Sequence, residues 1–181
     1  MEFMLLGGRH NKVVATDQTS RAILYDPDQH SVRTLRSLAA HKSTTASLTV
    51  GEDHLYVLGR VPGDDDYEDR CFECLEFDRD GDEDWHPRVL PPPPPYEYET
   101  DTPGVNSYAA VGVGGASPRI LISRARLGTY SFDTAAAAWS KAGDWMLPFR
   151  GRAEYVPEHL HPGGSSLSSI PSINSCGLHS P

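Results

Sequence analysis

The chain contains Phe132-Asp133, then Trp139, then Leu147-Pro148. The pattern, which occurs three times, is an aromatic residue and Asp, then Trp or a branched residue, then Leu and often Pro. The earlier copies are Phe77-Asp78…Trp85…Leu90-Pro91 and Tyr25-Asp26…Val32…Leu35. The three aromatic residues are 52 and 55 residues apart. A repeat of this length indicates stacked units of a few short strands, because such a unit cannot bury its apolar face alone.

Strand signals dominate the sequence between these repeats, and no segment has a convincing helical period. Residues 135–138 have high helix propensity, but the run is too short for a helix, so we expect a hairpin turn. Short runs of β-branched and aromatic residues, bounded by Gly, Asp and Pro, predict strands at 12–16, 21–25, 47–50, 55–58, 71–77, 107–113, 119–123 and 128–132.

These signals predict an all-β fold, an incomplete kelch-like β-propeller of about three blades, because kelch repeats have a period of about 50 residues. Closed propellers need about four to eight blades. We therefore expect that the ring is completed elsewhere or that the chain is a truncated product. The predicted units are 12–38, 47–92 and 107–149, with the start of a fourth at 150–158 and a disordered Ser-, Pro- and Gly-rich tail at 159–181.

The repeated residues are expected to be structural. An Asp at a strand end can accept hydrogen bonds from backbone N–H groups two residues on and so fix the turn. A Trp after that turn can pack between neighbouring units, where its large area contributes most. The structural repeat positions are Tyr25, Asp26, Phe77, Asp78, Trp85, Phe132, Asp133 and Trp139.

Composition restricts the partners and the compartment. The 16 basic and 25 acidic residues give a formal net charge of −9, so we expect no nucleic-acid partner and no membrane partner. Three cysteines do not form a disulfide framework, and neither a signal peptide nor a membrane span is predicted. A cytoplasmic or nuclear location is therefore expected.

No metal site or cofactor is expected from the sequence. Cys71 and Cys74 have the spacing of half a zinc site, but there is no second pair, and residues three apart on a strand point to opposite faces. Buried structural cysteines are the favoured reading. The acidic stretch 78–84 has Glu83 and Val89 where a calcium loop needs Gly and Glu, so a solvated hairpin is favoured.

Two other features could bind proteins. The acidic stretches 64–69 and 78–84 would form a patch for a basic partner if they lay on one rim. Residues Pro93-Pro94-Pro95-Tyr96 match a pattern that WW domains read, although a spacer between units explains the prolines equally well.

No catalytic residues are predicted. His10, His41, His54 and His86 fall in predicted turns without a spacing that suggests a site, and no nucleophile elbow or phosphate-binding glycine loop is present. His159 and His161 are interpreted as part of a polar tail.

Four stretches carry a resemblance to a known family. They are Lys12-Val-Val-Ala-Thr-Asp-Gln-Thr, Ser47-Leu-Thr-Val-Gly, Gly128-Thr-Tyr-Ser-Phe-Asp-Thr and Leu147-Pro-Phe-Arg-Gly-Arg-Ala-Glu-Tyr-Val-Pro-Glu-His. They resemble an uncharacterised, grass-expanded plant family with kelch-like, F-box-associated-type repeats. The resemblance implies a β-propeller-like interaction domain without assigned activity. No F-box-like segment precedes the first unit, so a ubiquitin-ligase adaptor role is not expected.

We therefore expect a non-enzymatic protein-interaction module whose exposed loop aromatics, Tyr67, Tyr96 and Tyr98, contact the partner. One alternative is a small-molecule enzyme of propeller type in complete relatives. It would need polar inner strands, whereas the presumed inner stretches 48–50 and 109–111 are small and apolar. Another alternative is a fragment with no independent function.

Overall fold

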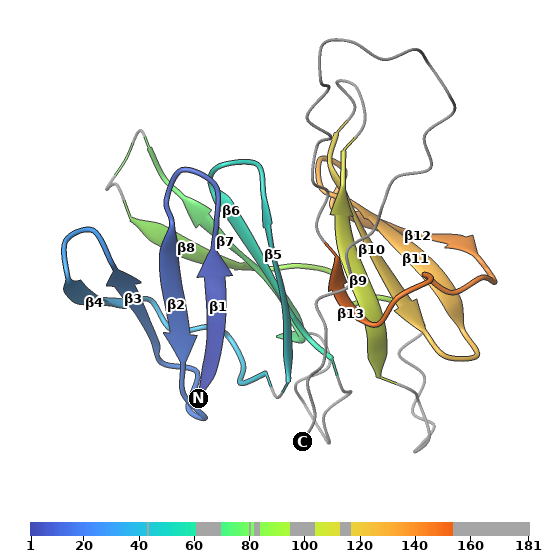
Figure 1. The fold of residues 1–181 in the computed structure, drawn as a ribbon, viewed down its shortest axis with the longest axis horizontal. Helices are drawn as coiled ribbons and strands as arrows, with labels where there is room; N and C mark the ends of the chain where they lie inside the picture. Colours follow the sequence, from blue (N-terminus) through green and yellow to red (C-terminus); the bar gives the residue numbers. More distant parts are fainter. Residues whose placement is uncertain are drawn as a thin grey trace, which may run out of the picture.

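The protein is all-β in the part of the chain that its computed structural model describes, which is residues 1–42, 44–60, 70–79, 81, 84–94, 104–112 and 117–153 (Figure 1). The strands of this part form three sheets in chain order. The first is an antiparallel meander of β1 (Glu2–Leu6), β2 (Lys12–Thr16), β3 (Ala22–Asp26) and β4 (Ser31–Leu35).

The second and third sheets repeat this plan. The second is the antiparallel meander β5 (Thr45–Val50), β6 (His54–Gly59), β7 (Phe72–Phe77) and β8 (Trp85–Val89). In the third, β9 (Val105–Val111), β10 (Arg119–Arg124), β11 (Gly128–Asp133) and β12 (Ala138–Gly143) pair in order, and β13 (Gly151–Ala153) lies parallel to β9.

Each of the eight predicted strands matches an observed strand to within a few residues. The predicted turn at 135–138 is also found, although Ala138 already begins β12. Two boundaries differ from the predicted units. The strand β1 belongs to the first sheet, which therefore begins at Glu2, and residues 151–153 join the third sheet instead of a fourth unit. The predicted tail at 159–181 lies outside the described residues.

The second sheet lies between the other two, with β1 in contact with β5 and β5 in contact with β9 (Figure 1). Successive side chains of a strand point to opposite faces. In β6, Leu55 and Val57 consequently pack toward the first sheet, and Tyr56 and Leu58 pack toward the third. Both faces of β6 are buried, and for this reason this strand reads as a continuous apolar run from Leu55 to Leu58.

The two cores have different compositions. The core between the first and second sheets, which we call the first core, is mainly aliphatic, with Trp85 only 1% exposed. The core between the second and third sheets is aromatic, with the rings of Phe72 and Phe132 4.9 Å apart at 85°. Trp139 packs 5.0 Å from Phe132, and its Nε1 donates to the Pro91 carbonyl at 2.8 Å. Both Trp residues of the repeat thus lie at contacts between sheets.

The Asp of the repeat forms the same turn in the first and third sheets. Asp26 Oδ1 accepts from the backbone N–H groups two and three residues on, at 3.0 and 3.1 Å. Asp133 Oδ1 makes the equivalent bonds at 3.0 and 3.1 Å. Four residues after each Asp the backbone has a positive φ, 50° at His30 and 51° at Ala137. The side-chain acceptor holds the turn although neither of these residues is a glycine.

A buried ion pair stabilises the connection between β4 and β5, which joins the first two sheets. Lys42 Nζ contacts a carboxylate oxygen of Glu73 on β7, and the side chains are 2% and 0% exposed. The other Glu73 oxygen accepts from the backbone N–H of Ala39 at 2.9 Å, and Lys42 also donates to the Ala40 carbonyl at 3.1 Å. Burial lowers the pKa of Lys42, and the charge of Glu73 opposes this effect. The pair orders the connection because each charge has hydrogen-bond partners.

Candidate functional site

The meander topology sorts the loops of the molecule to two opposite rims. We use "turn rim" for the side of the short hairpin turns at 7–11, 27–30, 51–53, 78–79 and 134–137. We use "connection rim" for the side where β4, β6 and β8 lead into the next strand, which includes 36–42, 60, 70–71 and 90–94.

Only one of the two acidic stretches has described residues. Residues 78–84 join β7 to β8 at the turn rim, where Asp78 and Asp84 are described. The stretch 64–69 lies outside the described residues, but Arg60 and Arg70, on either side of it, are at the connection rim. The conditional prediction of a shared acidic patch therefore depends on residues outside the described part of the chain, and it stays a prediction.

Charged side chains from three turns converge at the turn rim. Asp53, in the β5–β6 turn, lies 2.6 Å from Arg9 Nη2, 3.0 Å from His10 Nε2 and 2.6 Å from Arg79 Nε. Arg79 Nη2 also donates to Glu52 at 3.0 Å. We call Arg9, His10, Glu52, Asp53 and Arg79 the Asp53 cluster. It joins a turn of the first sheet to two turns of the second.

The electrostatics of the cluster are dominated by Asp53. Burial by itself would raise its pKa, but hydrogen bonds from Arg79, His10 and Arg9 outweigh this and hold the pKa well below its usual range. The hydrogen bond to Asp53 in turn raises the pKa of Arg79. Asp53 is therefore an ionised acceptor that is already occupied by donors, which suits it to hold turns in place.

His10 links this cluster to the first core. Its ring lies 4.9 Å from the ring of Trp85 and 5.2 Å from that of Phe77, with steep angles between the ring planes. The aromatic contacts fix the imidazole on one side, while Asp53 fixes Nε2 on the other. The cluster is thus anchored on repeat residues of the second sheet.

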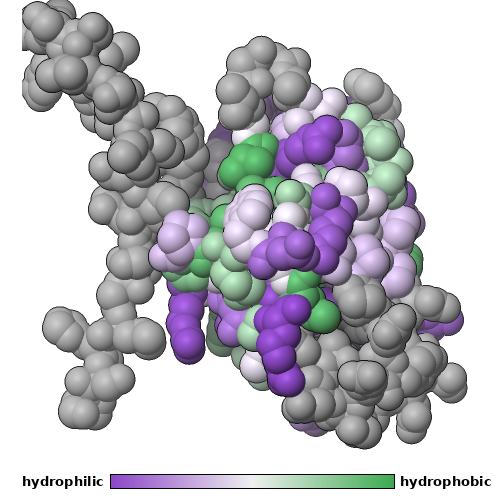
Figure 2. All heavy atoms as spheres, turned by 90° about the vertical axis from the view of Figure 1, so that its right-hand side faces the viewer, coloured by the Kyte–Doolittle hydropathy of each residue, from purple (hydrophilic) through white to green (hydrophobic). Residues whose placement is uncertain are grey.

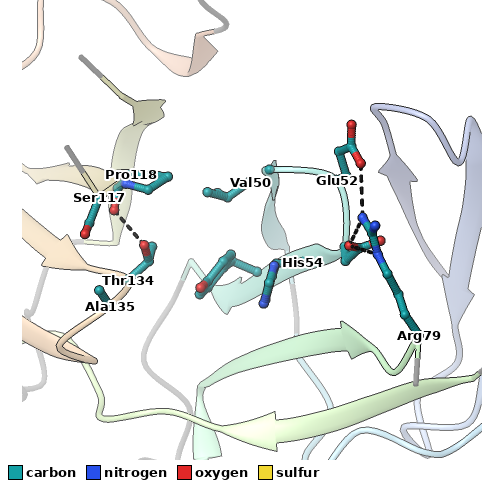
Figure 3. A pocket seen from close by; sticks show the side chains of 11 residues that line it. Val50, Glu52, His54, Arg79, Ser117, Pro118, Thr134 and Ala135 are labelled. Carbon is teal, nitrogen blue, oxygen red and sulfur yellow. Dashed lines mark hydrogen bonds and ion pairs between the residues drawn. The ribbon is translucent and has the colours of Figure 1, made fainter. Parts of the chain in front are cut away.

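A pocket of about 410 Å³ opens on the same rim between the second and third sheets (Figure 3). Figure 3 shows Glu52 and Arg79 on one side, Ser117, Pro118, Thr134 and Ala135 on the other, and Val50 and His54 between them. Thr134 Oγ1 donates to the Pro118 carbonyl at 2.7 Å, which holds the third-sheet wall together. We call this space the rim pocket.

The inner wall of the rim pocket includes His54 and Tyr56, whose rings stack at 6.3 Å and 23°. Burial raises the pKa of Tyr56, so its hydroxyl stays neutral even at a pH where an exposed tyrosine ionises. The pocket therefore combines an ion-paired wall, a wall of hydroxyl and proline residues, and an aromatic floor. This arrangement can bind a side chain or a small molecule through hydrogen bonds and stacking.

The structure corrects the expected placement of two histidines. His54 begins β6 and His86 lies in β8, so these two are in strands, not turns. His41 lies in the β4–β5 connection, and His10 lies in the Asp53 cluster. His159 and His161 lie outside the described residues.

The predicted contact residues Tyr67, Tyr96 and Tyr98 also lie outside the described residues. Cys74 is buried as predicted, whereas Cys71 is only partly buried, and burial raises the pKa of Cys74 to about 12, which makes this thiol unreactive at neutral pH. In the part of the chain that the structure describes, no group of three or more His, Cys, Asp or Glu residues could hold a metal ion.

The sequence did not reveal the Asp53 cluster. Arg9, Asp53 and Arg79 come from three turns, and 44 residues separate Arg9 from Asp53. No short motif can indicate such a site. The available signal was that each of these residues lies next to a predicted strand, in the turn that joins it to its neighbour. Once the pairing of the strands is known, the three turns fall on one rim.

Comparisons with known proteins identify a family. A family model described as "Protein of unknown function (DUF1668)" matches residues 1–180. No curated protein matches the chain. The expectation of an uncharacterised family is therefore confirmed. Separately, no helix within the described ranges has the length and apolar character needed to cross a bilayer.

Proposed function

We propose that this chain, which belongs to the DUF1668 family of proteins of unknown function, is a non-enzymatic protein-interaction module. Its three meanders would be kelch-like, F-box-associated-type repeats that form part of a β-propeller, as the resemblance in the sequence implies. Three four-stranded meanders whose first strands lie together support this reading (Figure 1).

The observation that carries the proposal is the construction of the turn rim. The Asp53 cluster ties turns from two sheets together through charge-assisted hydrogen bonds. A rim that is already ordered loses little conformational entropy when a partner binds. Loops held on a rigid scaffold are the usual location of binding residues.

The exposed parts of the cluster suit a protein partner. The side chains of Arg9 and Arg79 are 40% and 48% exposed, and that of Glu52 is 62% exposed. Arginine is enriched in protein interfaces because it contributes both packing and several donors. We infer that the partner is a protein that places an acceptor beside these arginines, in the cytoplasm or the nucleus.

Charge substitution on the rim tests this proposal. We expect Arg79→Glu to weaken capture of the partner from an extract of the source cells at least tenfold, because it places a like charge beside Glu52. Arg21→Glu is the matched control, because Arg21 lies at the opposite rim in an Asp17 ion pair, 74% exposed. If both variants captured every protein equally well, the turn rim would not be the binding surface.

The loop tyrosines form a second arm of the same experiment. If Tyr67, Tyr96 and Tyr98 contact the partner as predicted, the triple alanine variant releases it while the folded state persists. Release in this variant together with full retention in Arg79→Glu would assign the contact to the tyrosines and not to the turn rim.

The rim pocket favours a second candidate function, the binding of a small molecule. Its volume of about 410 Å³ falls in the range of ligand sites, roughly 300–1,000 Å³. Native mass spectrometry of the purified chain would show a bound organic ligand, and His54→Ala should then lower its occupancy. A ligand-free spectrum with no thermal shift in a metabolite screen would count against this candidate.

A further inference from the structure

The outer face of the first sheet is apolar and has no covering layer among the described residues. Met4, Leu6, Val14 and Leu24 point into the first core, so the residues that alternate with them point outward. One row across all four strands is Leu5, Val13, Tyr25 and Val32. Phe3 is 68% exposed, Val32 62%, Leu5 47% and Tyr25 39%.

The repeat shows what kind of layer this face fits. Tyr25 holds the position of Phe77 in the second sheet and Phe132 in the third. Phe77 packs against the core shared with the first sheet, and Phe132 lies in the core shared with the second. In both cases the aromatic residue faces the preceding sheet. The outer face of the first sheet is therefore shaped for packing against another β-sheet.

We propose that this apolar face packs against the same face of a second copy of the chain. Its eight outward positions on β1 to β4 carry no charge, so two identical faces meet without like-charge repulsion. An isologous contact of this kind closes as a two-fold dimer, the commonest form of homo-oligomer. The two sheets would stack about 10 Å apart with nearly aligned strands.

A head-to-tail contact between copies is less favourable. It would use the outward face of the third sheet, and residues 144–150 lie over part of that face. Thr129 Oγ1 donates to the Trp145 carbonyl at 2.6 Å, and the Leu147 N–H donates to Ser123 Oγ at 3.0 Å. Figure 2 shows this side of the molecule as a mixture of hydrophilic and hydrophobic residues, without a continuous hydrophobic area in its coloured part.

The size of the face sets the expected strength. Four strands of five residues cover on the order of 300 Å², at about 3.3 Å per residue and about 4.8 Å per strand. Stable interfaces bury about 800 Å² on each partner. We therefore expect a weak, reversible dimer, with a Kd in the micromolar range or above.

Sedimentation velocity of the purified chain over a hundredfold range of concentration tests the proposal. The weight-average mass should rise from the monomer's 19.8 kDa toward that of a dimer. Val32→Lys should raise the Kd at least tenfold. Val89→Lys is the matched control, since Val89 lies on the outermost strand of the second sheet at 45% exposure, and it should leave the Kd unchanged.

A mixing experiment distinguishes a lost contact between copies from misfolding of the variant. Val32→Lys and Val32→Glu should each be monomeric and fully folded by circular dichroism, and their equimolar mixture should associate again. If either variant does not fold, Leu5→Lys and Leu5→Glu take their place. A wild-type chain that remains monomeric, association that survives Val32→Lys, or equal loss in Val89→Lys would overturn the proposal.

Discussion

The first and second sheets share one plan but differ in what surrounds them. Both are four-stranded antiparallel meanders with an aromatic-Asp step at the end of the third strand. The second sheet is covered on both faces, whereas the first is covered on one. Equivalent positions therefore perform different tasks, which shows that the neighbouring layer, not the repeat itself, determines each residue's role.

Among three pairs of equivalent positions, two show the difference and one does not. The buried Glu73 corresponds to Arg21, whose side chain is 74% exposed in an ion pair with Asp17. The fully buried Leu75 corresponds to the half-buried Ile23. Cys74 corresponds to Ala22, and both are fully buried. These pairs provide matched controls for the predictions below.

Removal of the buried carboxylate should have the largest effect. Glu73→Ala leaves the Lys42 charge buried without its partner, and we expect a loss of about 3–5 kcal/mol in the free energy of unfolding. Arg21→Ala at the equivalent position should change it far less, because water replaces the lost partner. Urea denaturation measures both. A loss in Glu73→Ala no larger than in Arg21→Ala would contradict the comparison.

Truncation of the core should come next. Leu75→Ala removes a fully buried side chain and should lower the free energy of unfolding by about 2–5 kcal/mol. Ile23→Ala should cost clearly less, since its side chain is only half covered. Measurement at low protein concentration keeps self-association out of the result. Equal losses in the two variants would mean that the outer face of the first sheet is buried in the monomer.

Alkaline pH should destabilise the second sheet through its buried thiol. The pKa of Cys74 is raised by burial from about 9 to about 12, so the unfolded chain releases this proton first as the pH rises. The stabilising contribution is complete below pH 9 and is lost between pH 9 and 12, at up to about 1.4 kcal/mol per pH unit.

The control for this prediction comes from the first sheet. Cys74→Ala introduces the residue that the first sheet has at the equivalent position, Ala22. It should flatten the pH dependence of the unfolding free energy between pH 9 and 10. Tyr56, whose pKa burial also raises, should act in the same direction at higher pH. An unchanged slope in Cys74→Ala would show that the thiol is not the group responsible.

Surface substitution should have the smallest effect on stability. Val32→Lys and Val89→Lys should each change the free energy of unfolding of the monomer by no more than about 0.5 kcal/mol. At high protein concentration the wild type and Val89→Lys should gain thermal stability by mass action, whereas Val32→Lys should not. Melting temperatures over a concentration series measure this. A concentration dependence that is the same in all three would contradict it.

The strand pattern and the turns were predictable because both depend on local chemistry. Short runs of β-branched and aromatic residues predicted β2 and β11, and the Asp at the strand end predicted the turn that Asp133 forms. The fifth strand of the third sheet was not predicted, because three residues carry no period and β13 depends on the free edge of β9. The Asp53 cluster was missed for a related reason, since its members come from separate turns.

The sequence by itself determined that the chain is all-β and that a unit recurs every 52 to 55 residues, because strand alternation and turn residues act over a few neighbours. Only the tertiary structure decided which faces are covered. It brought Lys42 to Glu73, gathered three donors around Asp53, and left Tyr25 facing outward while Phe77 and Phe132 face other sheets. Burial is a property of how whole sheets stack, and no local stretch of sequence contains that information.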